Sequence, residues 1–312
     1  MAELRRSGGG RVVAVLFAAF LVICVAPVRK AAAHAALERQ IADLTKRIEA
    51  DPSNTDLFVR RGQVHRAHRD FRAAISDYER ARKLSPHLRA VDLYLGQVYL
   101  DADRAERALT YLDRFLERDP ANEEARAERG RALVMLGAPL EASLDFTCAV
   151  QAAARRGDPP PEYYLDRAQA QAAAGGDHLE EALSGLDEGI ARLGPVVTLE
   201  LAALDLELSL GRPEAALERL DRIASQSQRK ESFLFQRGEI LERAGQLSEA
   251  CASYQCAQEA MERLPLSKQR TAAMEKLRLG LNEALERIAG GEPSRTDRST
   301  FAGSKGEKKC NT

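Results

Sequence analysis

Residues 58–86 read FVRRGQVHRAHRDFRAAISDYERARKLSP, and this stretch contains the pattern that decides the fold. Apolar and small residues recur at three- and four-residue spacing in two runs, one on each side of Arg69-Asp70. That spacing is typical of amphipathic helices. Pro86 closes the second run, because proline lacks the backbone N–H that a helix interior uses. The stretch therefore predicts a pair of helices.

The same pattern returns at intervals of 34 residues along the chain. The second and third copies place matching residues at Leu95-Gly96, Tyr99, Ala108, Leu112, Phe115 and Pro120, and then at Gly130, Leu133, Ala142, Phe146 and Ala149. Small residues at the eighth and twentieth positions of each copy allow its two helices to approach closely, and larger residues fill the remaining space. The period predicts a row of similar helix pairs.

This pattern resembles the tetratricopeptide repeat, whose signature combines Leu-Gly, Tyr, Ala, Phe, Ala and Pro over 34 residues. The resemblance implies an all-α, right-handed α-solenoid of antiparallel helix pairs, a TPR-like superhelix. Six repeats are expected at 55–88, 89–122, 123–156, 161–196, 197–230 and 231–264. Flanking segments are expected to be an N-terminal capping helix (36–54), a C-terminal capping helix (265–290, its helix at about 266–289) and a disordered tail (291–312).

Composition agrees with this interpretation and excludes other classes. Aromatic residues make up 5% of the 312 residues and Trp is absent, which argues against a β-sandwich or barrel. The 46 basic and 47 acidic residues give a net charge of −1. A nucleic-acid binder usually carries a clear basic excess, so we expect no nucleic-acid partner.

The first 35 residues have the features of a secretory signal peptide. Arg5, Arg6 and Arg11 precede an apolar run over 12–26, and the small residues of Ala31-Ala32-Ala33-His34-Ala35 follow. We expect residues 1–35 to be removed, His34 included, and the protein to be extracytoplasmic, either periplasmic or secreted. Arg29 and Lys30 are unusual before a cleavage site, so membrane anchoring by residues 12–28 is the alternative. This segment is the one membrane contact that we expect.

A search for catalytic and metal motifs is negative. The sequence has no Gly-rich phosphate loop, no G-x-S-x-G and no H-E-x-x-H. His65 and His68 have ligand-like spacing, but His65 occupies a packing position and His68 points elsewhere. Cys251 and Cys256 would point about 140° apart on one helix, so we expect no bridge between them. We therefore predict a protein that is not an enzyme and has no cofactor and no metal.

Arginine and aspartate recur at fixed positions of the repeats. Arg61 and Arg129 occupy the seventh position, and Asp77 and Asp145 occupy the twenty-third. An arginine inside a narrow helix hairpin needs a partner. We therefore predict the ion pairs Arg61–Asp77 and Arg129–Asp145, each joining the two helices of one repeat.

The resemblance implies that the first helix of each repeat lines a concave groove that binds a peptide or a partner protein. The expected groove residues are Val59, Gln63, Arg66, Leu93, Gln97, Leu100, Ala127, Arg131, Leu165, Gln169, Phe235 and Glu239. A Gln offers donors and an acceptor to an extended peptide, although Gln is also a common residue on an exposed helix face. We expect a protein-interaction module or scaffold. The alternatives are an accessory chaperone or assembly factor for an envelope enzyme, and an enzyme with an unrecognised site.

Overall fold

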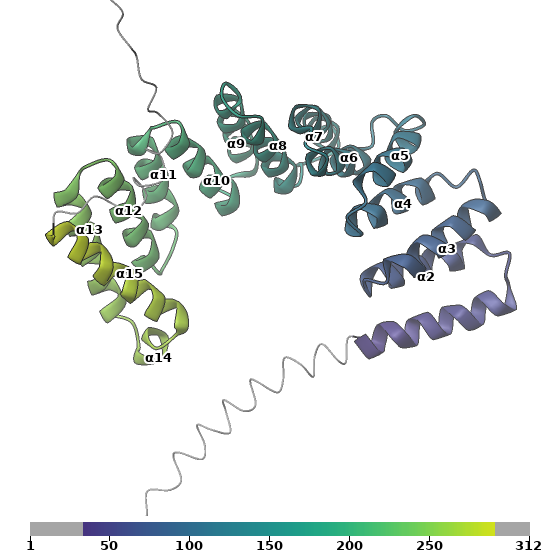
Figure 1. Cartoon of the computed structure of the whole chain (residues 1–312), viewed down its shortest axis with the longest axis horizontal. Helices are drawn as coiled ribbons and strands as arrows, with labels where there is room; N and C mark the ends of the chain where they lie inside the picture. Colours follow the sequence, from purple (N-terminus) through teal and green to yellow (C-terminus); the bar gives the residue numbers. More distant parts are fainter. Residues whose placement is uncertain (1–33, 291–312) are drawn as a thin grey trace, which may run out of the picture. The chain divides into compact units, whose positions relative to one another are not determined.

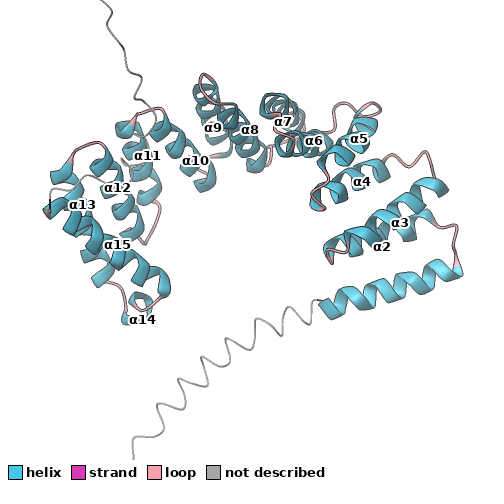
Figure 2. Cartoon of the chain, in the orientation of Figure 1, coloured by secondary structure: helices cyan, strands magenta, loops and turns pink. Residues whose placement is uncertain are grey.

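The computed structural model describes residues 34–290, and every regular element in that range is a helix (Figure 1, Figure 2). A first helix covers residues 34–50. The following helices are α2 (Thr55–Ala67), α3 (Phe71–Leu84), α4 (Ala90–Asp101), α5 (Ala105–Leu116), α6 (Glu123–Met135), α7 (Pro139–Ala154), α8 (Pro161–Ala174), α9 (His178–Leu193), α10 (Val197–Ser209), α11 (Pro213–Ser225), α12 (Glu231–Arg243), α13 (Leu247–Glu262), α14 (Leu266–Gln269) and α15 (Ala272–Ala289).

The chain forms two compact units, Met1–Ala152 and Ala153–Thr312. In the first unit α2 packs on α3 and α4 packs on α5, while α3 also contacts α4 and α5 contacts α6. One apolar core runs through these helices, and it includes Leu44 and Ile48 of the helix over 34–50. The first helix thus covers the apolar face of α2 that would otherwise meet water.

The second unit repeats this arrangement with α8 on α9, α10 on α11 and α12 on α13. Helix α15 packs on α13, and its buried Met274 and Leu281 join the core formed around Tyr254. The prediction of an all-α chain of stacked antiparallel helix pairs is therefore confirmed.

Close approach within a pair depends on the glycine at the eighth position. A Cβ on Gly62 would lie 2.5 Å from Cε1 of Tyr78, which is fully buried in α3. The same relation joins Gly96 to Leu112 and Gly130 to Phe146. The large residue of the second helix thus occupies the space that a side chain would take on the first, which is the physical reason for the Gly-and-large pattern in the sequence.

The predicted arginine–aspartate pairs are both confirmed. Nε and Nη2 of Arg61 donate to the two carboxylate oxygens of Asp77 at 2.8 and 2.7 Å. Arg129 binds Asp145 in the same way, at 2.6 and 2.7 Å. Each pair joins the two helices of one repeat with the fork-to-carboxylate geometry that makes such contacts strong.

These arginines also reach backward, which the sequence pattern did not indicate to us. Nη1 of Arg61 donates to the Thr45 hydroxyl at 3.0 Å, and Nη1 of Arg129 donates to Asp113 at 2.9 Å. Both partners lie 16 residues before the arginine, as Asp77 and Asp145 lie 16 after. We call this three-residue unit an arginine fork. It connects a repeat to the helix that precedes it.

The second unit keeps the backward contact in Arg237, which donates to Asp221 sixteen residues before it. It also contains a buried cluster of different residues. Arg219 of α11 is buried and binds Glu200 and Glu207 of α10 at 2.8 Å each. Its Nη2 also donates to Asp187 of α9 at 3.0 Å. The cation thus comes from the second helix of the repeat rather than the first, and it still joins three consecutive helices.

The C-terminal segment differs from the single helix expected over about 266–289. It contains a short α14 and then α15, separated at Arg270-Thr271. The Thr271 hydroxyl accepts a hydrogen bond from the Met274 backbone N–H, so Thr271 is the N-cap of α15. Threonine is a favoured N-cap residue, and this preference starts a new helix inside the expected one.

Two of the expected segments lie outside the described residues. The expected signal peptide and the C-terminal tail fall almost wholly in 1–33 and 291–312. Within residues 34–290, no helix has both the length and the apolar character needed to cross a bilayer. Cys148, Cys251 and Cys256 are unpaired.

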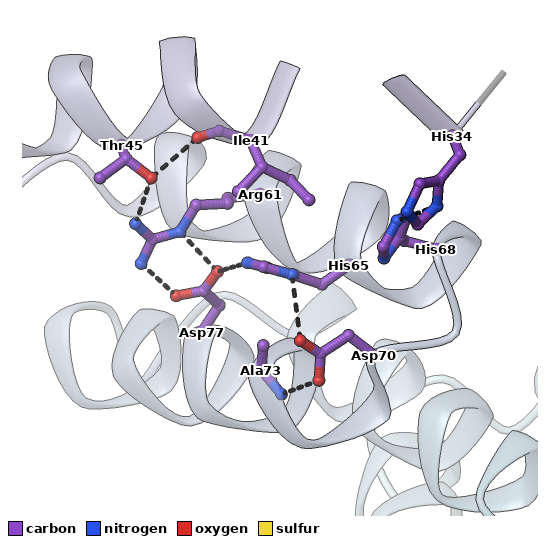
Figure 3. Close-up of polar contacts among 9 residues, drawn as sticks. All are labelled: His34, Ile41, Thr45, Arg61, His65, His68, Asp70, Ala73 and Asp77. Atoms are coloured by element: carbon purple, nitrogen blue, oxygen red, sulfur yellow. Dashed lines mark hydrogen bonds and ion pairs between the residues drawn. The ribbon is translucent and has the colours of Figure 1, made fainter. Parts of the chain in front are cut away.

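His65 gives a pH-dependent contribution to stability. Its side chain is 14% exposed, with Nδ1 3.8 Å from Asp70 and Nε2 3.9 Å from Asp77 (Figure 3). Burial lowers the pKa of His65 from its ordinary 6.5. The negative charges of Asp77 and Asp70 act in the opposite direction, while Arg61 and His68 lower the pKa further. A lowered histidine pKa stabilises the fold above 6.5, and this contribution is lost as pH falls below that value. We expect His65→Leu to lose less thermal stability than the natural chain between pH 7.5 and 5.5.

The control for this prediction is His87→Leu, because His87 is exposed in the loop before α4. Thermal unfolding followed by circular dichroism at both pH values gives the comparison. Equal loss of stability on acidification in His65→Leu and the natural chain would contradict the assignment.

Candidate functional site

A row of polar side chains crosses the first helices of three consecutive repeats in the first unit. Nη1 of Arg66 in α2 donates to Oε1 of Gln97 in α4 at 2.7 Å. Nε2 of Gln97 donates to Oε1 of Glu124 in α6, also at 2.7 Å. Arg66 binds Asp101 of α4 through its Nε atom as well. This polar row shows that α2, α4 and α6 present one continuous face.

The row continues on α6 through Glu128 and Arg131. Nη1 of Arg131 lies 3.3 Å from the Glu128 carboxylate. Burial raises the pKa of Glu128, and the positive charges of Arg131 and Arg66 oppose that effect. The face therefore carries cations and carboxylates side by side, and such a row of charges can complement charges of opposite sign on a partner.

A pocket of about 190 Å³ opens between α8 and α10 of the second unit. Its apolar wall includes Leu165 and Leu206, and Gln169 and Asp205 add polar groups. Gln169 is exposed, so its amide is available to a ligand. Burial raises the pKa of Asp205. An apolar wall beside a free amide can hold one side chain and the adjoining backbone of an extended peptide.

A second pocket, of about 440 Å³, lies between the helix over 34–50 and α2. Gln63 lines it together with Leu44 and Val64, and Arg47 and Arg60 line its polar part. Gln63 is exposed. Gln63 and Gln169 both occupy the ninth position of their repeats, and each lines a pocket.

The repeats of this chain match a known protein family. The family model described as tetratricopeptide repeat matches residues 59–123, 93–146 and 201–262. The chain is a tetratricopeptide repeat protein. The matches cover repeats in both compact units.

Solved structures agree on the fold of this tetratricopeptide repeat protein. A tetratricopeptide repeat protein from Parabacteroides merdae aligns with a TM-score of 0.51 and 16% identity, over 81% of this chain and 92% of that chain. The MamA protein aligns with a TM-score of 0.50 and 19% identity, over 56% of this chain and 93% of that chain. At these identities the likeness shows the fold alone. No curated protein sequence matches the chain.

The structure separates the twelve expected groove residues of this tetratricopeptide repeat protein by exposure. The side chains of four are buried: Val59, Leu93, Gln97 and Ala127. Gln97 is 5% exposed, and both ends of its amide are used by Arg66 and Glu124. It therefore connects repeats and has no free group for a peptide. Gln63 and Gln169 keep theirs.

The remaining expected residues are partly exposed: Arg66, Leu100, Arg131, Leu165, Phe235 and Glu239. Phe235 packs against Tyr254, with ring centroids 5.5 Å apart. Burial raises the pKa of Glu239, partly balanced by Arg243. Leu165 remains available to the pocket described above.

Sequence reasoning missed Asp101, Glu124 and Asp205, which carry the charge of these surfaces. Signals for Glu124 and Asp205 were present, because they occupy the second and ninth positions of their repeats, two groove-facing positions in the family that we did not read out there. Asp101 had no such signal. Its role depends on the neighbouring repeat, and a single-repeat pattern does not include it.

Proposed function

We propose that this protein is exported and acts as a protein-interaction module that holds an extended segment of a partner protein. The observation that supports this most directly is the pocket between α8 and α10, where apolar walls adjoin the exposed amide of Gln169. Its volume of about 190 Å³ suits one apolar side chain of the partner. The Gln169 amide would hold the backbone beside it, and Asp205 would favour a basic neighbour in the bound segment.

A pocket-filling substitution tests this proposal better than a change to Leu93 or Gln97. Those two residues are buried, so altering them would disturb the fold as well as binding. Ala172 lines the pocket, and Ala173 beside it is exposed and outside the pocket. Ala172→Phe and Ala173→Phe therefore add the same group to the same helix on different faces.

We expect the full chain, recovered from an exporting host, to retain a discrete partner from an envelope extract. Retention should fall at least tenfold in Ala172→Phe, the size of a hot-spot effect, and remain unchanged in Ala173→Phe. Mass spectrometry identifies the captured protein, and a stable stoichiometric complex distinguishes a scaffold from a chaperone that releases its product. Equal capture by both variants would place binding elsewhere and overturn the pocket assignment.

A further inference from the structure

Two histidines and a glutamate meet at the N-terminal end of the first unit. Nδ1 of His34 lies 2.6 Å from Nε2 of His68, and Nε2 of His34 lies 3.3 Å from the Glu38 carboxylate. Figure 3 shows the two imidazole rings facing each other across the helices that carry them. One ligand atom from each of the three residues lies within 4.8 Å of the others. The sequence search considered His68 with His65, whereas the fold brings it to His34.

The packing of the first helix on α2 produces this meeting. The helix over 34–50 and α2 run in opposite directions, so the start of one adjoins the end of the other (Figure 1). Their register is fixed by Leu44 and Ile48 in the core and by the hydrogen bond from Arg61 to Thr45 (Figure 3). His34 and Glu38 lie four residues apart on one helix face, and His68 is the C-cap residue of α2.

We propose that His34, Glu38 and His68 bind a late divalent transition-metal ion, Zn²⁺ or Cu²⁺. Imidazole nitrogen and carboxylate oxygen are common ligands of both ions. Ligands at about 2.0–2.2 Å from one ion lie within about 4.4 Å of each other, so only small rotations of these exposed or half-exposed side chains are needed. The C-terminal end of α2 also favours a cation. Among residues 34–290, this is the one group of three potential ligands that meets.

Processing of the N-terminus decides whether the site exists in the exported protein, so this part rests on the export proposed above. Ala31-x-Ala33 and Ala33-x-Ala35 are both small-residue cleavage sites. Cleavage after Ala33 makes His34 the first residue and gives it a free α-amino group, which adds a third nitrogen ligand beside Nδ1. Cleavage after Ala35 removes His34. The proposed site therefore requires cleavage after Ala33, which leaves His34 in place.

The test begins with the full chain expressed in an exporting host. Intact-mass measurement identifies the first residue, and calorimetric titration with ZnCl₂, CuCl₂ and MgCl₂ measures binding. We expect a chain that starts at His34 and binds one Zn²⁺ or Cu²⁺, with no binding of Mg²⁺, which prefers oxygen ligands. Affinity should fall at least tenfold in His68→Ala and in His34→Ala. The ion should also raise the unfolding temperature of the natural chain but not of these variants.

His87→Ala is the matched control, because His87 is exposed and lies outside the cluster, and it should bind as the natural chain does. Equal metal affinity in His68→Ala and the natural chain would overturn the site. Absence of Zn²⁺ and Cu²⁺ binding would overturn it too, as would a mature chain that starts at Ala36. The pocket between α8 and α10 lies in the other unit, so failure of the metal site leaves the partner-binding result separately readable.

Discussion

Replacing Arg219 by Met is expected to destabilise the second unit by about 3–5 kcal/mol, the range found when one member of a buried ion pair is removed. Arg219 is 5% exposed, and the two glutamates that it binds, Glu200 and Glu207, are 5% and 6% exposed. Burial alone would lower the pKa of Arg219, but the hydrogen bonds that it donates to Glu207 and Glu200 raise it well above its ordinary value. Arg219 is therefore charged in the folded chain.

The substitution leaves the two carboxylates in unequal positions. Arg222 lies 3.8 Å from Glu200 and keeps some positive charge near it. Arg219 is the cation bound to Glu207, whose Oε2 atom already lacks a hydrogen-bond partner. We therefore expect Glu207 to cause most of the loss. Arg219→Met combined with Glu207→Met should recover much of the stability, because an apolar replacement removes the unpaired charge as well.

Urea unfolding and hydrogen exchange of peptides from α10 and α11 measure this effect. Arg212→Ala is the control, since Arg212 forms an exposed pair with Glu180 in the same unit, and exposed pairs contribute about 0–1 kcal/mol. A loss in Arg219→Met no larger than that in Arg212→Ala would show that the buried cluster is not needed for stability.

Replacing Tyr78 by Ala is expected to cost the first unit about 3–5 kcal/mol, as large-to-small changes of buried aromatic residues do. Tyr78 is 1% exposed, fills the space over Gly62 and stacks on Tyr94 with ring centroids 5.6 Å apart. Its loss opens a cavity between α2 and α3, because the packed helices relax only in part around the missing ring.

Tyr111→Ala provides the comparison in the same unit. Tyr111 also stacks on a neighbouring ring, that of Tyr99 at 5.4 Å, but it is only partly buried. We expect its replacement to cost about 1–2 kcal/mol. Urea unfolding measures the loss of unfolding free energy in both variants. Similar losses in Tyr78→Ala and Tyr111→Ala would show that the position over Gly62 has no special role.

The sequence predicted those parts of the fold that repeat. The Gly62–Tyr78 contact and the Arg61–Asp77 pair each lie inside one repeat, so the 34-residue period indicates them directly. Features that depend on two repeats were harder to predict. The backward contact of Arg61 to Thr45 and the use of Gln97 as a connector both require the register between neighbouring helix pairs.

Exposure explains why the candidate site was predicted only in part. A repeat position defines the direction of a side chain, but the neighbouring repeat decides whether that side chain is covered. Gln97 is covered because Arg66 and Glu124 are long enough to reach its amide from both sides. Gln169 occupies the same position, with Leu165 and Ala172 on its own helix and Asp205 on α10, and it stays open.

The arginine forks have a consequence for how this chain could have grown by duplication. Arg129 needs an acceptor 16 residues before it and another 16 residues after it, and these belong to different repeats. A copied or transplanted repeat would carry one acceptor with it and leave the other behind. A duplication would therefore keep the fork complete only where the recipient neighbour already offers a threonine or an acid at the correct distance.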